Sequence, residues 1–348
     1  MSIKDLRDGD HYFGRLLVAD MRRCLSGKGK SYLSLSLQDK TGVIEAKKWD
    51  VDEGDEELFA KGKVLRIEGD VLLYNKALQM KIKSGSQVST EEIDWGELLQ
   101  SAPLTQEELT KKYQAYLDSL ANPDIRKLVE EVVRLSQGRY FYWPGAVRNH
   151  HEFTCGLLYH SLTMADLAVK VCEVYPSLNR DIVLAGTLIH DIGKTIELSG
   201  PQACSFTIEG KLLGHVSLGF SLVDKAAHDI GLFAFDDLKE EEKTPDHPLY
   251  AKKELAVTIE HIMLSHHGKQ EFGSPVIPLT REALAVSFID DFDAKMMILD
   301  KAYEPIMPGE STAKIFSMDD RYFYKPTYAK ENPSPAGLSL EEEMEAIK

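Results

Sequence analysis

Histidine is concentrated in one stretch of this chain of 348 residues, because ten of its eleven histidines lie between His150 and His267. The sharpest motif is the adjacent pair His190 and Asp191 in AGTLIHDIGK, where an apolar run ends in an imidazole beside a carboxylate. A buried aspartate is unfavourable without a counter-charge, and a divalent cation is a natural one. Imidazole and carboxylate together suit Mn²⁺, Fe²⁺, Co²⁺ or Zn²⁺ better than Ca²⁺.

The same stretch holds further residues of metal-binding type at helical positions. They are His160 in GLLYHSL, His215 in KLLGHVSLG, His266 and His267 before Gly268, and Asp290 in SFIDDFDAK. Any one of them is most simply a core or surface residue with a hydrogen-bond partner, which is how we interpret His11, His228, His247 and His261. That interpretation does not account for the whole ordered set, so we predict that the set forms a metal site.

These residues need a helical scaffold to bring them together. Thr105 and Glu108 have the spacing of a capping box, and helical periodicity continues beyond them. We expect helices over residues 105–120, 123–137, 156–174, 180–192, 212–230, 251–265 and 281–303. In the third of these, one apolar stripe is formed by Leu158, Leu162, Ala165, Val169 and Cys172. Residues 150–303 are therefore predicted to be all-helical, and residues 91–149 to be a linker with helices that pack on that domain.

The first ninety residues have a different pattern. Leu33, Leu35 and Leu37 alternate with more polar residues, as in a half-buried strand. Similar runs cover residues 12–18, 43–49, 64–68 and 77–82, with turn residues between them. Five short strands indicate an OB-type β-barrel over residues 1–90. The predicted fold is thus multidomain α+β, a five-stranded barrel followed by a helical bundle and a C-terminal extension, residues 304–348, whose last part is expected to be flexible.

The barrel carries residues suited to a single nucleic-acid strand, because bases stack on aromatic rings while Lys and Arg follow the phosphates. The candidates are Arg22, Arg23, Lys28, Lys30, Tyr32, Lys47 and Trp49. The alternative is that the basic residues are solvated loop charges and that the two aromatic residues only pack. The net charge is −15, with +2 on residues 1–90 and −17 on the remainder. The barrel is therefore the expected anion-binding surface, whereas the acidic remainder needs cations to accept a phosphate.

Composition excludes some classes of protein. The chain is 43% hydrophobic and 28% charged, and no apolar run approaches the roughly 18 residues of a membrane span. The polar N-terminal residues do not look like a secretory signal. The four cysteines are widely spaced and form no CxxC pair, which argues against a disulfide framework and a zinc ribbon. We expect a cytoplasmic protein with reduced thiols and no membrane partner, and a homo-oligomer is compatible with the sequence.

The order of the motifs resembles the HD-domain superfamily of metal-dependent phosphohydrolases, whose signature runs His, His-Asp and a distant Asp. An OB-like N-terminus joined to NHHEFTCGLLYHSL, HDIGK, EGKLLGH, LSHHGKQEFGSP and IDDFDAK looks more specifically like the YhaM-type 3'-5' exoribonucleases, from about Gly9 to Pro326. The resemblance implies an HD domain over residues 150–303 that holds two divalent ions. One would be held by His160, His190, Asp191 and Asp290. The second would be held by His215, His266 and His267, with Asp191 bridging. Mn²⁺ is the expected ion, with Co²⁺, Fe²⁺ and Zn²⁺ as alternatives.

The implied reaction is hydrolysis of single-stranded RNA by metal-activated water, with single-stranded DNA as a further substrate. Beside Asp191, we assign Lys194 to a phosphate contact, although a solvated lysine at a helix end fits nearly as well. His151 is a candidate for contacting substrate or protonating the leaving group, or else belongs to an exposed pair with His150. Asp293, three residues after Asp290, could orient a ligand or form a helix salt bridge.

Two other functions stay open at this stage. A small-nucleotide or cyclic-nucleotide phosphohydrolase would use the same metal ligands, but HHGKQEFGSP lacks the GYP element of cyclic-dinucleotide enzymes, and a barrel is superfluous for a mononucleotide. A non-catalytic single-strand-binding or replication-accessory protein would use the metal structurally. A structural site needs closed coordination, which a bridging carboxylate with spare positions does not provide.

Overall fold

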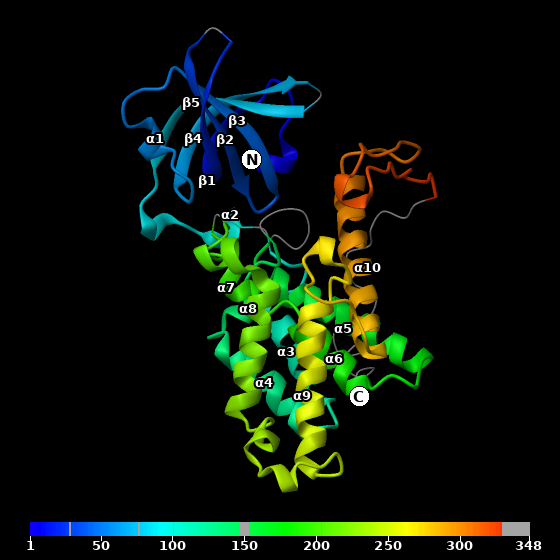
Figure 1. The fold of residues 1–348 in the computed structure, drawn as a ribbon. Coiled ribbons are helices and arrows are strands. Elements are labelled where there is room, and N and C mark those ends of the chain that lie inside the picture. Colours follow the sequence, from blue (N-terminus) through cyan, green and yellow to red (C-terminus); the bar gives the residue numbers. More distant parts are fainter. Residues whose placement is uncertain (28, 76, 100, 147–152, 203, 329–348) are drawn as a thin grey trace. The chain divides into compact units, whose positions relative to one another are not determined.

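The computed structural model describes residues 1–27, 29–75, 77–99, 101–146, 153–202 and 204–328 (Figure 1). These residues form two compact units, of which one comprises Met1–Ser101 and Ser199–Ser205 and the other the rest of the described chain. The end of the C-terminal extension, which is predicted to be flexible, lies outside the described residues. Within those ranges, no helix combines the length and the apolarity that a bilayer crossing requires.

The first unit is a closed barrel. Its strands are β1 (His11–Leu25), β2 (Ser31–Asp39), β3 (Gly42–Trp49), β4 (Val64–Tyr74) and β5 (Ala77–Gln87). The order around the barrel is β1-β2-β3-β5-β4, and β3 and β5 run parallel while the other neighbours are antiparallel. Closure pairs the two edges of the sheet. The predicted five-stranded barrel is confirmed. Four of the predicted strands lie within observed ones, and the predicted strand over residues 30–38 begins one residue before β2.

The alternation in β2 explains how the barrel separates its core from its surface. Leu33, Leu35 and Leu37 are at most 1% exposed and belong to the barrel core. Residues between them point to the opposite face, because successive side chains of a strand alternate. On that face, the register of β2 with β3 places Tyr32 opposite Trp49.

The second unit is helical. Its longer helices are α3 (Gln106–Asp118), α4 (Pro123–Leu135), α5 (Gly156–Val174), α6 (Arg180–Ile189), α8 (Ile208–Asp229), α9 (Pro248–Ser265) and α10 (Arg281–Tyr303). The capping box at the start of α3 is confirmed, since Thr105 Oγ1 accepts from the Glu108 backbone and the Glu108 carboxylate accepts from Thr105 N. In α5 the predicted stripe is fully buried at Leu158, Leu162 and Ala165 and partly buried at its last two positions.

Short elements complete both units. They are η1 (Ile3–Asp5), α1 (Asp55–Leu58), η2 (Thr90–Glu92), α2 (Trp95–Leu98), η3 (Arg139–Phe141), α7 (Lys194–Glu197), η4 (Ala234–Asp237), η5 (Glu240–Glu242), η6 (Gln270–Phe272) and η7 (Phe316–Met318). After α10 the chain forms antiparallel bridges, Ser311 with Tyr324 and Ile315 with Arg321.

The predicted helix over residues 180–192 is shorter than expected. It ends at Ile189, and residues 190–193 form a turn before α7. Gly193 lies against the backbone of α8, where an added Cβ would be 2.0 Å from His215 O and 2.5 Å from Gly219 N. A side chain at this position would separate the turn from α8. The glycine therefore allows the chain segment that carries His190 and Asp191 to lie directly against the segment that carries His215.

Four helices share one apolar core in this unit. The buried cluster contains Met164, Ala168, Val183, Ile262, Ala283, Val286 and Ile289, which come from α5, α6, α9 and α10. Burial of each methionine, valine and isoleucine side chain in this cluster contributes roughly 1.5–3 kcal/mol, and the two alanines contribute less. Because this cluster holds the four helices together, residues far apart in sequence are held at fixed positions relative to one another.

Candidate metal centre

Three of the four packed helices bring the predicted metal-binding residues of the first group into one buried place. His160 lies within α5, His190 and Asp191 follow the end of α6, and Asp290 lies within α10. His160, His190 and Asp191 are at most 2% exposed, and Asp290 is 7% exposed. One ligand atom from each of His160, His190 and Asp191 lies within 4.8 Å of the others.

The inner nitrogens of this group converge. His160 Nε2 is 3.2 Å from His190 Nε2 and 3.2 Å from Asp290 Oδ1, while His190 Nε2 is 3.3 Å from Asp191 Oδ2. The outer nitrogens point away from the centre. His160 Nδ1 is 2.7 Å from Asp293 Oδ2, and His190 Nδ1 is 3.0 Å from the carbonyl oxygen of Thr187. A ring whose Nδ1 donates to an acceptor offers the Nε2 lone pair to a metal.

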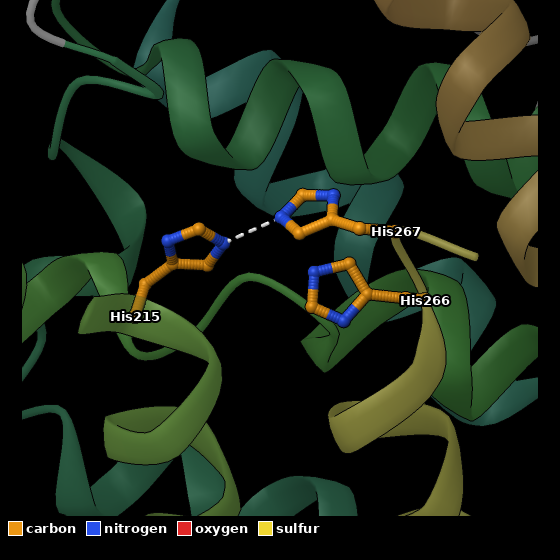
Figure 2. Close-up of side chains that lie close together, drawn as sticks. All are labelled: His215, His266 and His267. Carbon is orange, nitrogen blue, oxygen red and sulfur yellow. Dashed lines mark hydrogen bonds between the residues drawn. The ribbon is translucent and has the colours of Figure 1, made fainter. Parts of the chain in front are cut away.

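His215, His266 and His267 form a second group (Figure 2). This group adjoins the first, because His215 Nε2 lies 3.4 Å from Asp191 Oδ1. His215 Nε2 lies 2.9 Å from His267 Nε2. His266 is buried, and its Nδ1 lies 2.8 Å from the carbonyl oxygen of Met263. His267 presents its Nδ1 to Asp290 Oδ2 at 3.4 Å, and its backbone N–H donates to the buried Ser274 hydroxyl at 3.1 Å. All three rings therefore have at least one nitrogen directed toward the same small region.

Asp191 faces both groups with different oxygens. Its Oδ2 is the oxygen nearest His190 Nε2, whereas its Oδ1 lies 3.4 Å from His215 Nε2 and 3.8 Å from His266 Nε2. Burial alone would raise the pKa of this carboxyl, but the positive charge of Lys194 and its interactions with the rings of His190 and His215 hold the pKa well below its usual range. Asp191 is thus an ionised carboxylate that can bridge two cations.

The donor set fits metal ions by a test that is independent of any motif. Asp191 Oδ1 and His266 Nε2 are buried and have no hydrogen-bond partner among the described residues. Buried polar atoms in folded proteins are almost always satisfied, so each such atom needs an explanation. Burial, with a contribution from His267, lowers the pKa of His266 well below its usual range, so this ring is neutral. A neutral imidazole nitrogen and a carboxylate oxygen, both unsatisfied, are what a divalent cation coordinates.

Negative charge dominates the other side of the centre. Burial alone would lower the pKa of His160, but its hydrogen bonds with Asp290 and Asp293 raise it to about 10. Burial alone would raise the pKa of Asp290, but hydrogen bonds with His160 and His267 hold it well below its usual range. The same carboxylates that attract a proton to His160 would attract a cation in its place.

Lys194 is buried in this centre at the start of α7. Its Nζ lies 2.6 Å from Asp191 Oδ2, and the residue is 8% exposed. The alternative of a solvated lysine at a helix end is therefore wrong. Burial by itself would lower the pKa of Lys194, but the Asp191 carboxylate raises it above its usual range. Lys194 is a fixed positive charge beside the ligand atoms.

Some contacts at the centre were not predicted from the sequence. Glu197 accepts hydrogen bonds from both the backbone and the ring of His215. The available signal was an acidic residue in the otherwise uncharged run TIELSG after HDIGK. The carbonyls of Thr187 and Met263 carry no signal at all, because any residue type supplies a carbonyl. His151 lies outside the described residues.

The barrel carries an aromatic cluster on its surface. Tyr32 and Trp49 are stacked with centroids 4.6 Å apart, and Lys47 Nζ lies 5.5 Å and 5.7 Å from the two rings. Tyr74 was not predicted, yet Lys47 Nζ is 5.3 Å from its ring. Trp49 is 37% exposed and Tyr74 53% exposed, so both rings present part of their surface to solvent.

Of the other predicted basic residues of the barrel, those that the structure describes lie at exposed positions. Arg22 and Arg23 are exposed and form ion pairs, Arg22 with Asp20 and Arg23 with Glu56. Surface pairs of this kind are weak and leave the cations accessible. Lys30 is exposed at the end of the loop that follows β1, and Lys28 lies outside the described residues.

Known proteins resemble this chain over most of its length. The family model described as HD domain matches residues 157–295. The 3'-5' exoribonuclease YhaM of Geobacillus sp. (strain WCH70) is 38% identical over 315 residues, which cover 90% of this chain and 91% of that protein. The 3'-5' exoribonuclease YhaM of Bacillus subtilis (strain 168) is 37% identical over 316 residues, which cover 90% and 95% respectively. A match of this extent includes residues of both the barrel and the helical unit.

Proposed function

This chain belongs to the YhaM family of 3'-5' exoribonucleases, and from that premise we propose that it hydrolyses single-stranded RNA from the 3' end in a metal-dependent reaction. The observation that carries the proposal is the convergence of buried imidazole and carboxylate groups within the residues that match the HD domain. The products are nucleoside monophosphates, and single-stranded DNA is a further substrate.

The ligand assignment follows the two groups of side chains. One ion would be held by His160, His190, Asp191 Oδ2 and Asp290, and the other by His215, His266, His267 and Asp191 Oδ1. Mn²⁺ is the proposed ion, with Co²⁺, Fe²⁺ and Zn²⁺ as alternatives, because mixed imidazole and carboxylate ligands suit these metals. Such ions, when bound, lower the pKa of a coordinated water and neutralise negative charge on the phosphate.

The residues around the ligands have separate tasks. Asp293 and Glu197 hold the outer nitrogens of His160 and His215, which keeps the inner nitrogens directed at the ions. Lys194 supplies a fixed positive charge beside Asp191 that stabilises the charge developing on the phosphate oxygens. His151 is the proposed proton donor to the leaving oxygen.

The surface of the barrel favours a polymeric substrate rather than a mononucleotide. The exposed rings of Trp49 and Tyr74 present faces on which bases can stack, and Lys47 adds a positive charge for the backbone. Arg22, Arg23 and Lys30 are proposed to extend this positive surface. Stacking tolerates any base, so we expect weak sequence preference.

The experiment follows the fate of labelled strands. Full-length protein is incubated with 5'-labelled single-stranded RNA and with matched DNA in the presence of Mn²⁺, Mg²⁺, Co²⁺ or Zn²⁺. We expect a ladder of stepwise shortening with Mn²⁺, complete inhibition by a chelator, and release of nucleoside monophosphates. The variant His190→Ala/Asp191→Ala should be inactive. A folded double variant that degrades RNA at the wild-type rate contradicts the proposal, and strand binding without cleavage under every metal favours a non-catalytic protein.

A further inference from the structure

The carboxylate of Glu197 holds His215 through two contacts. Glu197 Oε1 accepts from the His215 backbone N–H at 2.9 Å and lies 3.1 Å from His215 Nδ1. Glu197 is only 7% exposed, so water competes weakly for these hydrogen bonds. An acceptor at Nδ1 keeps the proton on that nitrogen and leaves the lone pair on Nε2. That Nε2 is the atom that faces Asp191 Oδ1 and His267 Nε2.

Helix α8 is interrupted beside this contact. Gly214 has φ 72° and ψ 158°, which lies outside the helical region and in a part of backbone space that only glycine adopts readily. An added Cβ at Gly214 would meet nothing within 4 Å, so the backbone conformation and not crowding requires glycine here. His215 is the first residue after the interruption, and its N–H donates to the Glu197 side chain.

Glu197 also holds the start of α8 through its backbone oxygen. The backbone oxygen of Glu197 accepts from Thr207 N at 2.9 Å and from Thr207 Oγ1 at 3.1 Å, and Thr207 is the N-cap of α8. Gly210 packs so closely that an added Cβ would be 2.3 Å from Glu197 O. The segment from Thr207 to His215 is thus held at both ends by one residue of α7. Since α7 directly follows the turn that carries Asp191, this arrangement fixes His215 relative to the bridging carboxylate.

We propose that Glu197 is the positioning residue for the ion held by His215, His266 and His267. Ion binding at this second position depends on the Glu197 carboxylate, whereas binding at the position formed by His160, His190 and Asp290 does not. The inference rests on the proposed metal-dependent function, because it assigns one residue to one of its two ion positions.

The test measures ion binding, not activity. Full-length metal-free protein is titrated with Mn²⁺ by isothermal calorimetry, and the loaded samples are examined by electron paramagnetic resonance, which distinguishes a spin-coupled Mn²⁺ pair from isolated ions. Wild-type protein should bind two ions and give the coupled spectrum. Glu197→Ala should weaken one binding event by about 10- to 100-fold and give the spectrum of isolated Mn²⁺.

Two further variants sharpen the result. Glu197→Gln keeps the length and one acceptor oxygen but loses the charge, so it should restore part of the affinity, leaving one event about 3- to 10-fold weaker than in wild type. Glu209→Gln changes an exposed glutamate in the first turn of α8 and should bind both ions normally. Circular dichroism of the metal-free variants checks folding, and if Glu197→Ala does not fold, the glutamine variant decides.

Each outcome has a definite meaning. Folded Glu197 variants that bind two ions with wild-type affinity overturn the inference, and so does a wild-type protein that binds one ion only, because no second position then exists. In both cases the proposed hydrolysis of RNA still stands. A wild-type protein that binds no divalent ion overturns the proposed function itself.

Discussion

Replacing Asp293 by asparagine should weaken ion binding at the position that contains His160. Asp293 Oδ2 lies 2.7 Å from His160 Nδ1, and the two residues are 5% and 1% exposed. Asparagine has nearly the same shape and keeps one acceptor oxygen, so His160 keeps its orientation. What is lost is the negative charge that makes the ring a stronger ligand.

The size of the effect follows from this contact. A hydrogen bond to a charged group contributes about 1.5–3 kcal/mol, and a neutral acceptor retains roughly half of that. The expected loss is therefore about 0.7–1.5 kcal/mol, which corresponds to about 3- to 12-fold weaker Mn²⁺ binding. Asp293→Ala removes the acceptor altogether and should weaken binding by about 10- to 100-fold.

The assay is a calorimetric Mn²⁺ titration of the full chain, paired with the rate of RNA shortening. Asp291→Asn is the matched control on the same helix, because the Asp291 side chain is 52% exposed and pairs only with surface Lys295 at 2.5 Å in the described structure. The control should bind Mn²⁺ as wild type does. If both Asp293 variants fold and bind two ions with unchanged affinity, the reasoning that links the outer hydrogen bond to ion binding is refuted.

Three further outcomes are expected. Trp49→Ala should raise the KM for single-stranded RNA by about 5- to 150-fold, the loss of one stacked base, and leave hydrolysis of bis(p-nitrophenyl) phosphate unchanged; equal effects on both substrates argue against a stacking role. Gly193→Ala should lower the free energy of unfolding by about 1–3 kcal/mol or more, measured by chemical denaturation, because its Cβ would clash with His215 O; an unchanged midpoint contradicts this. Burial, reinforced by Asp224, raises the pKa of Glu260 from 4.5 to about 7. The folded state therefore holds Glu260 in its protonated form more strongly than the unfolded state does. As the pH rises from about 4.5 through 7, the folded protein should lose up to about 3 kcal/mol of stability. Glu260→Gln should flatten the pH dependence of unfolding, and parallel curves for the two proteins refute the assignment.

Local patterns were sufficient to predict most elements of the fold. The period-2 alternation of Leu33, Leu35 and Leu37 predicted a strand with a buried face, and the strand is observed. The capping box at Thr105 predicted the start of α3 within one residue. The end of α6 was not predicted, because the turn at Gly193 depends on close approach to a backbone 22 residues further along the chain.

The sequence predicted some residues of the candidate site and not others, for a physical reason. Residue type and order were enough to select His160, Asp191 and the other ligand candidates, because imidazole and carboxylate are common ligands of divalent ions. Asp293 was selected as an orienting residue from its spacing to Asp290, but the contact of Glu197 with His215 arises only when separate segments fold together. The outer nitrogens of His190 and His266 meet backbone carbonyls three residues earlier, which no residue type reveals. Tyr74 was missed because its position near Lys47 depends on strand pairing in the barrel, where β5 lies between β3 and β4.

The division of Asp191 between two histidine groups also has a consequence for how ions load. If two ions bind as proposed, a cation on Oδ2 would withdraw electron density from the whole carboxylate, so Oδ1 would be a poorer donor for the next cation, and mutual repulsion would add to the effect. Equilibrium linkage makes this weakening reciprocal, so each ion lowers the affinity for the other whichever position binds first. Loading should therefore show negative cooperativity, with a tight first affinity and a weaker second one, so that the concentration of free metal decides how many molecules carry the full pair.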